Sequence, residues 1–302
     1  MMPDTATAQT LNQQFGIPQT VRFDDGPHGQ PHAIITADDA TAVLYLHGAH
    51  LTEYQPTGRK PVLFTSRQTQ LKPGKPIRGG IPICFPWFGP KQGDPAAPMH
   101  GLARTQSWNL DAVHKLDDQR VQLTLTCSID PFHVTYTVTV GTQLELHLRV
   151  HNTTPANTSA SAARFEQALH TYFAVSQIRS VALAGLAGLT YLDKTQAFNR
   201  VTQGPEPVRF EGETDRVYIN HPGDCTLADP AWARQIVIEK ANANSTIVWN
   251  PWTDKASQMP DLGDDEWPDF VCIESGNVAD NAVELAPGEA HEMSTTIRVE
   301  DL

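Results

Sequence analysis

The chain has 302 residues, 40% of them hydrophobic, and a formal charge of -12 that results from 22 Lys and Arg against 34 Asp and Glu. The hydrophobic fraction provides for a sizeable core and excludes a disordered or low-complexity protein. Because the net negative charge repels nucleic acid and anionic membrane surfaces, we expect neither as a partner. An anionic substrate would need a local basic cluster.

The N-terminal residues and the cysteines bear on location. Residues 1–12 are polar and lack the basic and apolar regions of a signal peptide, and no stretch approaches the ~18 apolar residues that a membrane span needs. The cysteines are Cys84, Cys127, Cys225 and Cys272. They are far apart and form no C-x-x-C pair, so we expect reduced thiols and a cytoplasmic protein.

Alternation of apolar and polar residues dominates the chain. In chain order, it predicts strands at residues 43–46, 121–127, 134–140, 144–150, 236–239, 246–249, 270–273 and 295–299. The second to fourth of these are separated only by short turn signals, which favours an antiparallel meander.

The overall pattern predicts an all-β protein, a large antiparallel β-sandwich, since prolines number 23 and no long run has helical spacing. No internal repeat is evident, which argues against a propeller or solenoid. The polar stretch 151–162 is either a boundary or a long loop, and residues 254–269 are expected to form an acidic loop. We expect one domain over residues 1–302, with residues 1–18 as an irregular lead, and a monomer.

Five segments differ from ordinary strand and turn sequence: residues 77–86 (IRGGIPICFP), 100–104 (HGLAR), 169–173 (LHTYF), 248–252 (VWNPW) and 271–277 (VCIESGN). Glycines beside an arginine allow sharp turns that bring a guanidinium close to a ligand. Taken singly, a histidine in a strand is more often structural than catalytic, and Trp249 and Trp252 are expected in the core. Glu274 follows an apolar run that carries it to the rim of a sheet, where a carboxylate needs a partner or a purpose.

Together these segments carry a family resemblance. RGGIPICFPWFG, HGLAR, LHTYF, ETDRVY, WNPW and CIESGN, in this order, resemble the glucose-6-phosphate 1-epimerases, the phosphosugar branch of the aldose 1-epimerase (galactose mutarotase-like) superfamily. The resemblance runs over residues 19–299. It implies a galactose mutarotase-like supersandwich, a hexose 6-phosphate such as glucose 6-phosphate as substrate, and no metal or organic cofactor.

The resemblance also implies residue roles. His170 matches the catalytic acid of the family and Glu274 the catalytic base. His100 and Asp215 match sugar-binding residues, and Arg78 and Arg104 match the phosphate-binding arginines. Met99 stands where many relatives carry Gln, so one polar contact is missing.

Such an acid and base suit mutarotation, the interconversion of α and β anomers. A proton leaves the anomeric hydroxyl while another reaches the ring oxygen, and the opened sugar rotates about C1–C2 and closes again. Each positioned proton transfer typically contributes ~10²–10⁴ in rate. A histidine, with an ordinary pKa near 6.5, serves as the acid at neutral pH if carboxylates raise that pKa slightly.

Four alternatives remain open. Glu274 and Asp215 resemble the paired carboxylates of a glycosidase, which would leave the histidine and the arginines without a role. A non-catalytic sugar-phosphate sensor shares the fold but needs no acid–base pair. A mutarotase for unphosphorylated aldoses needs no arginine pair. A metal site at His147 and His151 is disfavoured because the two straddle a strand end.

Overall fold

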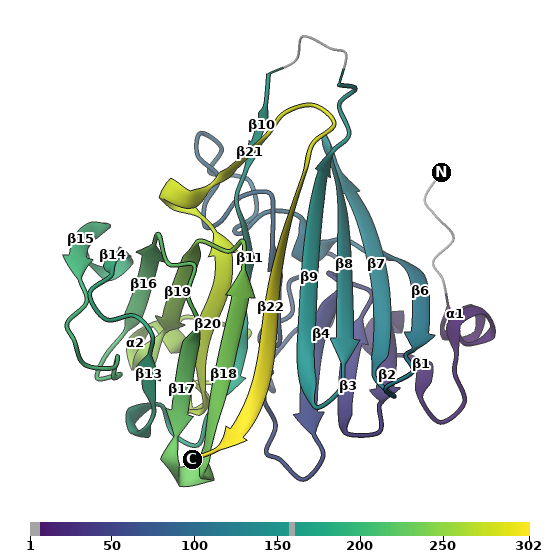
Figure 1. The fold of residues 1–302 in the computed structure, drawn as a ribbon, viewed down its shortest axis with the longest axis horizontal. Coiled ribbons are helices and arrows are strands. Elements are labelled where there is room, and N and C mark those ends of the chain that lie inside the picture. Colours follow the sequence, from purple (N-terminus) through teal and green to yellow (C-terminus); the bar gives the residue numbers. More distant parts are fainter. Residues whose placement is uncertain (1–6, 157–160) are drawn as a thin grey trace.

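The computed structural model describes residues 7–156 and 161–302 as a sandwich of two layers. One layer, here the back sheet, has eight strands that cross the whole molecule (Figure 1). In spatial order they are β13 (Ala182–Ala184), β17 (Cys225–Asp229), β18 (Arg234–Ala241), β22 (Ala290–Asp301), β9 (Gln143–Asn152), β8 (Phe132–Val140), β7 (Val121–Ile129) and β6 (Asn109–Lys115).

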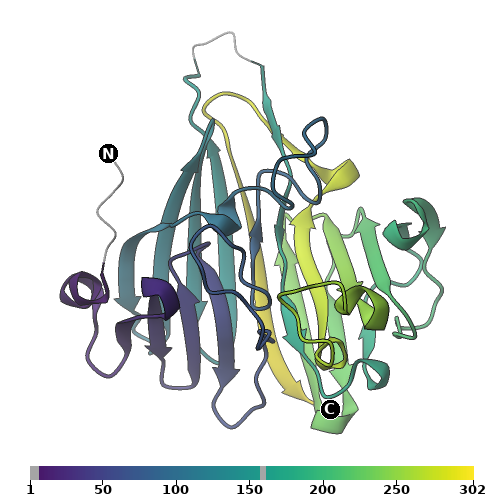
Figure 2. The ribbon, with the colours of Figure 1, turned by 180° about the vertical axis from the view of Figure 1, so that it is seen from behind.

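The second layer consists of two sheets side by side (Figure 2). The N-terminal sheet comprises β1 (Val21–Asp25), β2 (Pro31–Thr36), β3 (Ala40–Tyr45) and β4 (His50–Pro56). The site sheet comprises, in spatial order, β15 (Asn199–Thr202), β14 (Thr190–Asp193), β16 (Thr214–Ile219), β19 (Ser245–Asn250), β20 (Phe270–Asn277), β11 (Gln167–Leu169) and β5 (Ile83–Cys84), with β12 (Tyr172–Ala174) also paired to β20. A short ribbon pairs β10 (Ala163–Phe165) with β21 (Val283–Leu285).

Helices are few and short. The α-helices are α1 (Ala8–Phe15) and α2 (Trp252–Ala256). Single 3₁₀ turns are η1 (Pro27–Gly29), η2 (Ala103–Thr105), η3 (Ile178–Ser180), η4 (Lys194–Gln196), η5 (Pro230–Trp232), η6 (Trp267–Asp269) and η7 (Ala279–Asn281). Among the described residues, no helix is long and apolar enough to span a membrane.

The predicted all-β sandwich is confirmed, and each predicted strand overlaps an observed one, in chain order β3, β7, β8, β9, β18, β19, β20 and β22, with the first prediction extending one residue beyond β3. The meander is present as β7, β8 and β9, in which Val121 opposes Val140 and Val138 opposes Leu146. In these three strands the two-residue period of the sequence corresponds to alternating burial, because one face packs against the core and the other is more exposed.

The prediction that residues 1–18 form an irregular lead was wrong for residues 8–15. Residues 8–15 form α1, whose first turn is capped by Thr7, since its side chain accepts a hydrogen bond from the backbone N–H of Thr10. Asn12 anchors the helix by bonding both the N–H and the C=O of Phe23. Eight residues are too few for helical periodicity to stand out. The expected acidic loop likewise contains part of α2 and all of η6.

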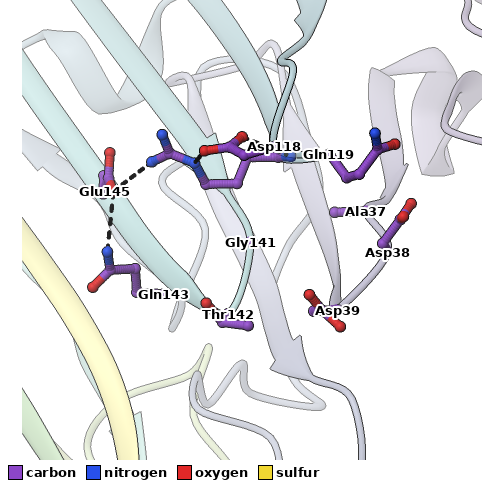
Figure 3. Close-up of a pocket in the computed structure, with 10 residues that line it drawn as sticks. Ala37, Asp38, Asp39, Asp118, Gln119, Gly141, Thr142, Gln143 and Glu145 are labelled. Atoms are coloured by element: carbon purple, nitrogen blue, oxygen red, sulfur yellow. Dashed lines mark hydrogen bonds and ion pairs between the residues drawn. The ribbon is translucent and has the colours of Figure 1, made fainter.

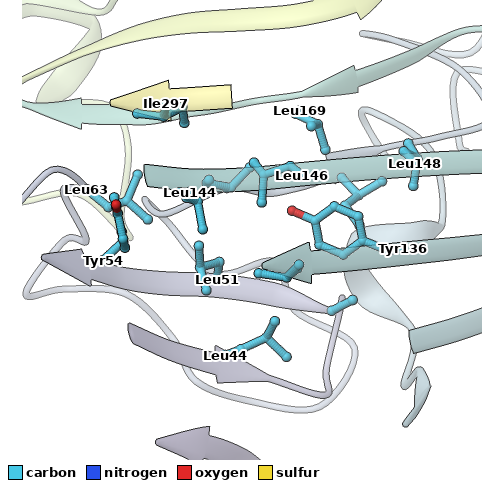
Figure 4. Packing of buried hydrophobic residues seen from close by; sticks show 14 of the residues in the cluster. Leu44, Leu51, Tyr54, Leu63, Tyr136, Leu144, Leu146, Leu148, Leu169 and Ile297 are labelled. Atoms are coloured by element: carbon cyan, nitrogen blue, oxygen red, sulfur yellow. The ribbon is translucent and has the colours of Figure 1, made fainter. Parts of the chain in front are cut away.

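The core lies between the two layers. Leu144, Leu146 and Leu148 of the back sheet face the N-terminal sheet, where Leu44 and Leu51 meet them (Figure 4). All five side chains are fully buried. Each contributes about 1.5–3 kcal/mol by leaving water, so this core holds the back sheet and the N-terminal sheet together.

Two tyrosines in this core test the cost of a buried hydroxyl. Tyr54 donates to the C=O of Gly141 at 3.0 Å, whereas the hydroxyl of Tyr136 is buried without a partner among the described residues. Tyr136→Phe should therefore leave stability unchanged or raise it by about 1 kcal/mol. The matched change Tyr54→Phe should lower it by about 1 kcal/mol. Urea unfolding of both variants measures the difference, and equal losses would contradict the assignment.

Candidate active site

A pocket of about 300 Å³ lies on the outer face of the site sheet. All six residues singled out from the sequence line it, namely Arg78, His100, Arg104, His170, Asp215 and Glu274. They come from parts of the chain that are almost 200 residues apart. The fold therefore gathers the predicted site residues into one place.

Strand register explains how the two carboxylates meet. Across β16, β19 and β20, Asp215 opposes Trp249, which opposes Cys272. Two residues along each strand, and so on the same face, Ile247 opposes Glu274. Directly opposed residues point to the same face of a sheet, so Asp215 and Glu274 share a face. This is the face turned away from the interlayer core.

His170 and Glu274 are in direct contact, with His170 Nε2 3.3 Å from Glu274 Oε1. His170 was expected in a strand, but it lies in the two-residue link between β11 and β12. Its N–H donates to the C=O of Pro82, and its ring stacks on Tyr172 with centroids 4.9 Å apart. Glu274 is also not at the strand rim: β20 continues to Asn277, and Glu274 is 1% exposed.

Burial suppresses charge on both members of this pair. It lowers the pKa of His170 well below its ordinary value, and the positive charges of Arg104 and Arg78 lower it further. Burial likewise raises the pKa of Glu274 well above its ordinary value, against the opposing effect of Lys194. The expectation that carboxylates would raise the histidine pKa was therefore wrong for the empty pocket, where cations and burial prevail.

Arg78 is held by a glycine-dependent loop. Gly79 and Gly80 have φ angles of +109° and +59°. A Cβ atom added at these two positions would lie 2.4 and 2.2 Å from backbone oxygens, so only glycine fits. The Arg78 guanidinium donates to the hydroxyl of Tyr172 at 2.9 Å and pairs with Asp261 at 3.1 Å. Its charge is therefore already partly compensated.

Arg104 is different because it lacks an acidic partner. It lies in η2, where its Nη2 donates to the C=O of Met99 at 2.7 Å. Its buried Nε has no hydrogen-bond partner among the described residues, and none of their carboxylates forms an ion pair with it. Burial lowers the pKa of Arg104, as expected for a cation without a counter-charge.

Two lysines of the pocket were not predicted from the sequence. Lys194, at the start of η4, pairs with Asp215 at 3.0 Å, and Lys255 in α2 pairs with Glu213 at 2.7 Å. The one local signal was Asp193, whose carboxylate accepts hydrogen bonds from the two residues after Lys194 and so fixes the turn that presents it.

Other expectations for this region are partly corrected. Trp249 is buried, as expected, but it also lines the pocket, where its ring forms a T-shaped contact with that of His170. Trp252 is only partly buried and packs on Trp267. Cys272 shares the face of Glu274 but is completely buried under Tyr172 and Trp249, whereas Met99 lines the pocket and is 49% exposed.

A second hollow lies where three hairpin turns meet (Figure 3). Its lining includes Asp38, Asp39, Asp118 and Glu145, and its one cation, Arg120, is already bonded to Asp118 and Glu145. It therefore offers no free positive charge to an anion. Within the described ranges, no cluster of three or more His, Cys, Asp or Glu side chains is arranged to hold a metal ion.

The pocket and the sandwich together define a class of protein. A buried carboxyl and an imidazole in contact can exchange protons with two neighbouring oxygens of a ligand, and polar groups around them can bind hydroxyls. This combination on an all-β sandwich suits acid–base chemistry on a carbohydrate.

Comparison with known proteins also points to carbohydrate chemistry. The aldose 1-epimerase family matches residues 32–298, and the chain belongs to this family of isomerases. An Escherichia coli K12 protein named "Putative glucose-6-phosphate 1-epimerase" is 35% identical over 282 residues, which are 88% of this chain and 89% of that protein. A protein of the same name from Cenchrus ciliaris is 34% identical over 268 residues, 84% of this chain and 79% of that one.

The fold comparison gives the same family. The crystal structure of a "putative mutarotase (YeaD)" from Salmonella typhimurium superposes with a TM-score of 0.86 at 27% identity, covering 95% of this chain and 96% of that one. The galactose mutarotase-like sandwich implied by the sequence motifs is thereby confirmed.

Lys194 should control the ionisation of Glu274. Because its charge is the largest influence that lowers the pKa of Glu274 against burial, Lys194→Met should raise that pKa further. The control is Lys255→Met, which removes a charge that acts on Asp215. Carboxyl ¹³C NMR titration measures both. An unchanged Glu274 pKa in Lys194→Met would contradict the assignment.

Proposed function

We propose that this protein is a mutarotase for a hexose 6-phosphate, with glucose 6-phosphate as the first candidate. Glu274 takes the proton of the anomeric hydroxyl, and His170 gives a proton to the ring oxygen. Asp215 and His100 hold sugar hydroxyls, and the arginines bind the phosphate. Reclosure after rotation about C1–C2 returns both groups to their starting states.

The observation that carries the phosphate assignment is the state of Arg104. A partly buried guanidinium whose Nε is buried without an acidic partner is costly, and a ligand dianion supplies the missing charge through strong, geometrically specific hydrogen bonds. Arg78 lines the same pocket, so two guanidinium groups are available on one ligand group. A pocket for a neutral aldose would need neither.

The contact within the acid–base pair supports the proton transfers. Two titratable groups 3.3 Å apart share their protons and titrate as a unit. His170 and Glu274 both line the pocket, so each is accessible to a sugar bound there. The names of the relatives from Escherichia coli and Cenchrus ciliaris, which refer to glucose 6-phosphate, agree with this proposal.

We also propose that the enzyme is cytoplasmic and monomeric. All four cysteines are free and buried, which suits a reducing compartment. Size-exclusion chromatography with light scattering tests the monomer.

Replacement of either proton-transfer group should nearly abolish activity. His170→Asn and Glu274→Gln should each lower kcat for freshly dissolved α-glucose 6-phosphate by ~10²–10⁴. Polarimetry, with the protein-free rate subtracted, measures the loss. His147→Asn, on the back sheet, is the matched control and should keep wild-type activity. A variant that retains more than about a tenth of kcat would refute the assigned role of its residue.

Loss of the unpaired arginine should act on the phosphorylated sugar. Arg104→Ala should raise KM for glucose 6-phosphate at least about thirtyfold, since loss of a desolvated charged contact costs about 2–5 kcal/mol. It should not reduce any activity on free glucose. Arg149→Ala, which removes an exposed arginine of β9, is the control. Equal KM values in wild type and Arg104→Ala would leave an ordinary aldose mutarotase as the better description.

A further inference from the structure

One of the two proposed phosphate-binding arginines, Arg78, is linked to the proposed acid through Tyr172, and the other, Arg104, lines the same pocket. Arg78 donates to the hydroxyl of Tyr172 at 2.9 Å, and the ring of Tyr172 stacks on His170 at 4.9 Å with an interplanar angle of 16°. The backbone fixes this arrangement, because the N–H groups of Tyr172 and His170 donate to the C=O groups of Gly80 and Pro82, just after Arg78. The anion site and the acid are therefore parts of one rigid unit.

Among the protein's own groups, the positive charge of Arg104 and Arg78 opposes a further proton on His170. Arg104 has no acidic partner among the described residues, and His170 Nδ1 is buried without a hydrogen bond. After burial, Arg104 and Arg78 are the main reasons that the pKa of His170 is low. The neutral imidazole that results is a poor proton donor for a ring oxygen.

The remaining groups around His170 do not offset this effect. His100 is edge-on at 5.6 Å and its own pKa is lowered by burial and by Arg104. Lys194 adds positive charge, and Trp249 carries none. Glu274 is the one carboxyl group in contact, and burial favours its protonated form.

We propose that the phosphate group of the substrate activates the enzyme as well as anchoring the sugar. A dianion on Arg78 and Arg104 cancels the positive charge that faces His170, and His170 then carries the proton that the ring oxygen accepts. This inference rests on the proposed function. It predicts that the activating dianion and the reacting sugar need not be covalently joined.

The proton required is already in the pocket. Its transfer from Glu274 Oε1 to His170 Nε2 breaks one O–H bond, forms one N–H bond, and leaves a carboxylate base beside a cationic acid. The two atoms lie 3.3 Å apart and Glu274 Oε1 has no hydrogen-bond partner among the described residues, so the transfer also requires the side chains to turn into hydrogen-bonding geometry. Bound phosphate favours this direction because Arg104 and Arg78 are the chief charges acting on His170. The chief charge acting on Glu274 is instead Lys194, which the phosphate leaves in place.

A sugar and a separate dianion test the inference. D-Xylose resembles glucose 6-phosphate without its phosphorylated arm, and inorganic sulfate is a dianion too weakly basic to catalyse mutarotation itself. With ionic strength held constant by sodium chloride, sulfate should raise the enzyme-dependent kcat/KM for D-xylose by about tenfold or more, in a saturable way. Arg104→Gln should lose the saturable response, and Arg149→Ala should keep it.

Protonation of His170 provides a second measurement. Imidazole ¹⁵N NMR, with the signal assigned by its loss in His170→Asn, should show that sulfate raises the pKa of His170. Arg104→Gln should raise that pKa without sulfate, a change that a merely anchoring arginine would not cause.

The outcomes separate this inference from the proposed function. If sulfate competes with glucose 6-phosphate but neither activates D-xylose turnover nor moves the pKa of His170, phosphate is an anchor only and the inference is wrong. An unchanged His170 pKa in Arg104→Gln would also overturn it. If the wild type does not accelerate glucose 6-phosphate mutarotation, the proposed function itself fails.

Discussion

The contact between Glu274 and His170 inside the protein is the constraint on which the rest of the site depends. A carboxyl that is 1% exposed takes up a proton or needs compensating positive charge, and a buried imidazole stays neutral unless negative charge is near. The pocket supplies cations to both groups, Lys194 toward the carboxyl and the arginines toward the imidazole. Lys194 therefore favours the ionised carboxylate, whereas the arginines oppose a charged imidazole.

The sandwich fixes these groups with little freedom. Asp215 and Glu274 lie in hydrogen-bonded strands, and their shared face follows from register. The residues without regular structure are tied down by backbone contacts, as in the hydrogen bonds from His170 and Tyr172 to the loop after Arg78. Positions held in this way restrict the movement of the proposed acid, the proposed base and the proposed anion site, as a preorganised site requires.

The fold and much of the site were predictable from the sequence, for different reasons. Strand positions follow from a two-residue period that one-sided burial imposes, so β7, β8 and β9 were evident. The six site residues came from local motifs. The pairing of Lys194 with Asp215 had no such signal, since a lysine in a polar turn looks like any solvated side chain until the register of β14 and β16 brings the two together. The pKa of His170 was mispredicted because it depends on burial and on two arginines that are distant in the sequence but line the same pocket.

The net charge of -12 has a counterpart in the arrangement of the pocket. Three of its four lysines and arginines have an acidic partner within the described chain, Asp261 for Arg78, Asp215 for Lys194 and Glu213 for Lys255. The overall field thus repels anions, and the paired cations add little attraction beyond their own partners. Arg104 is left without an acidic partner among the described residues, and the proposed phosphate dianion, bound between Arg104 and Arg78, supplies the missing negative charge.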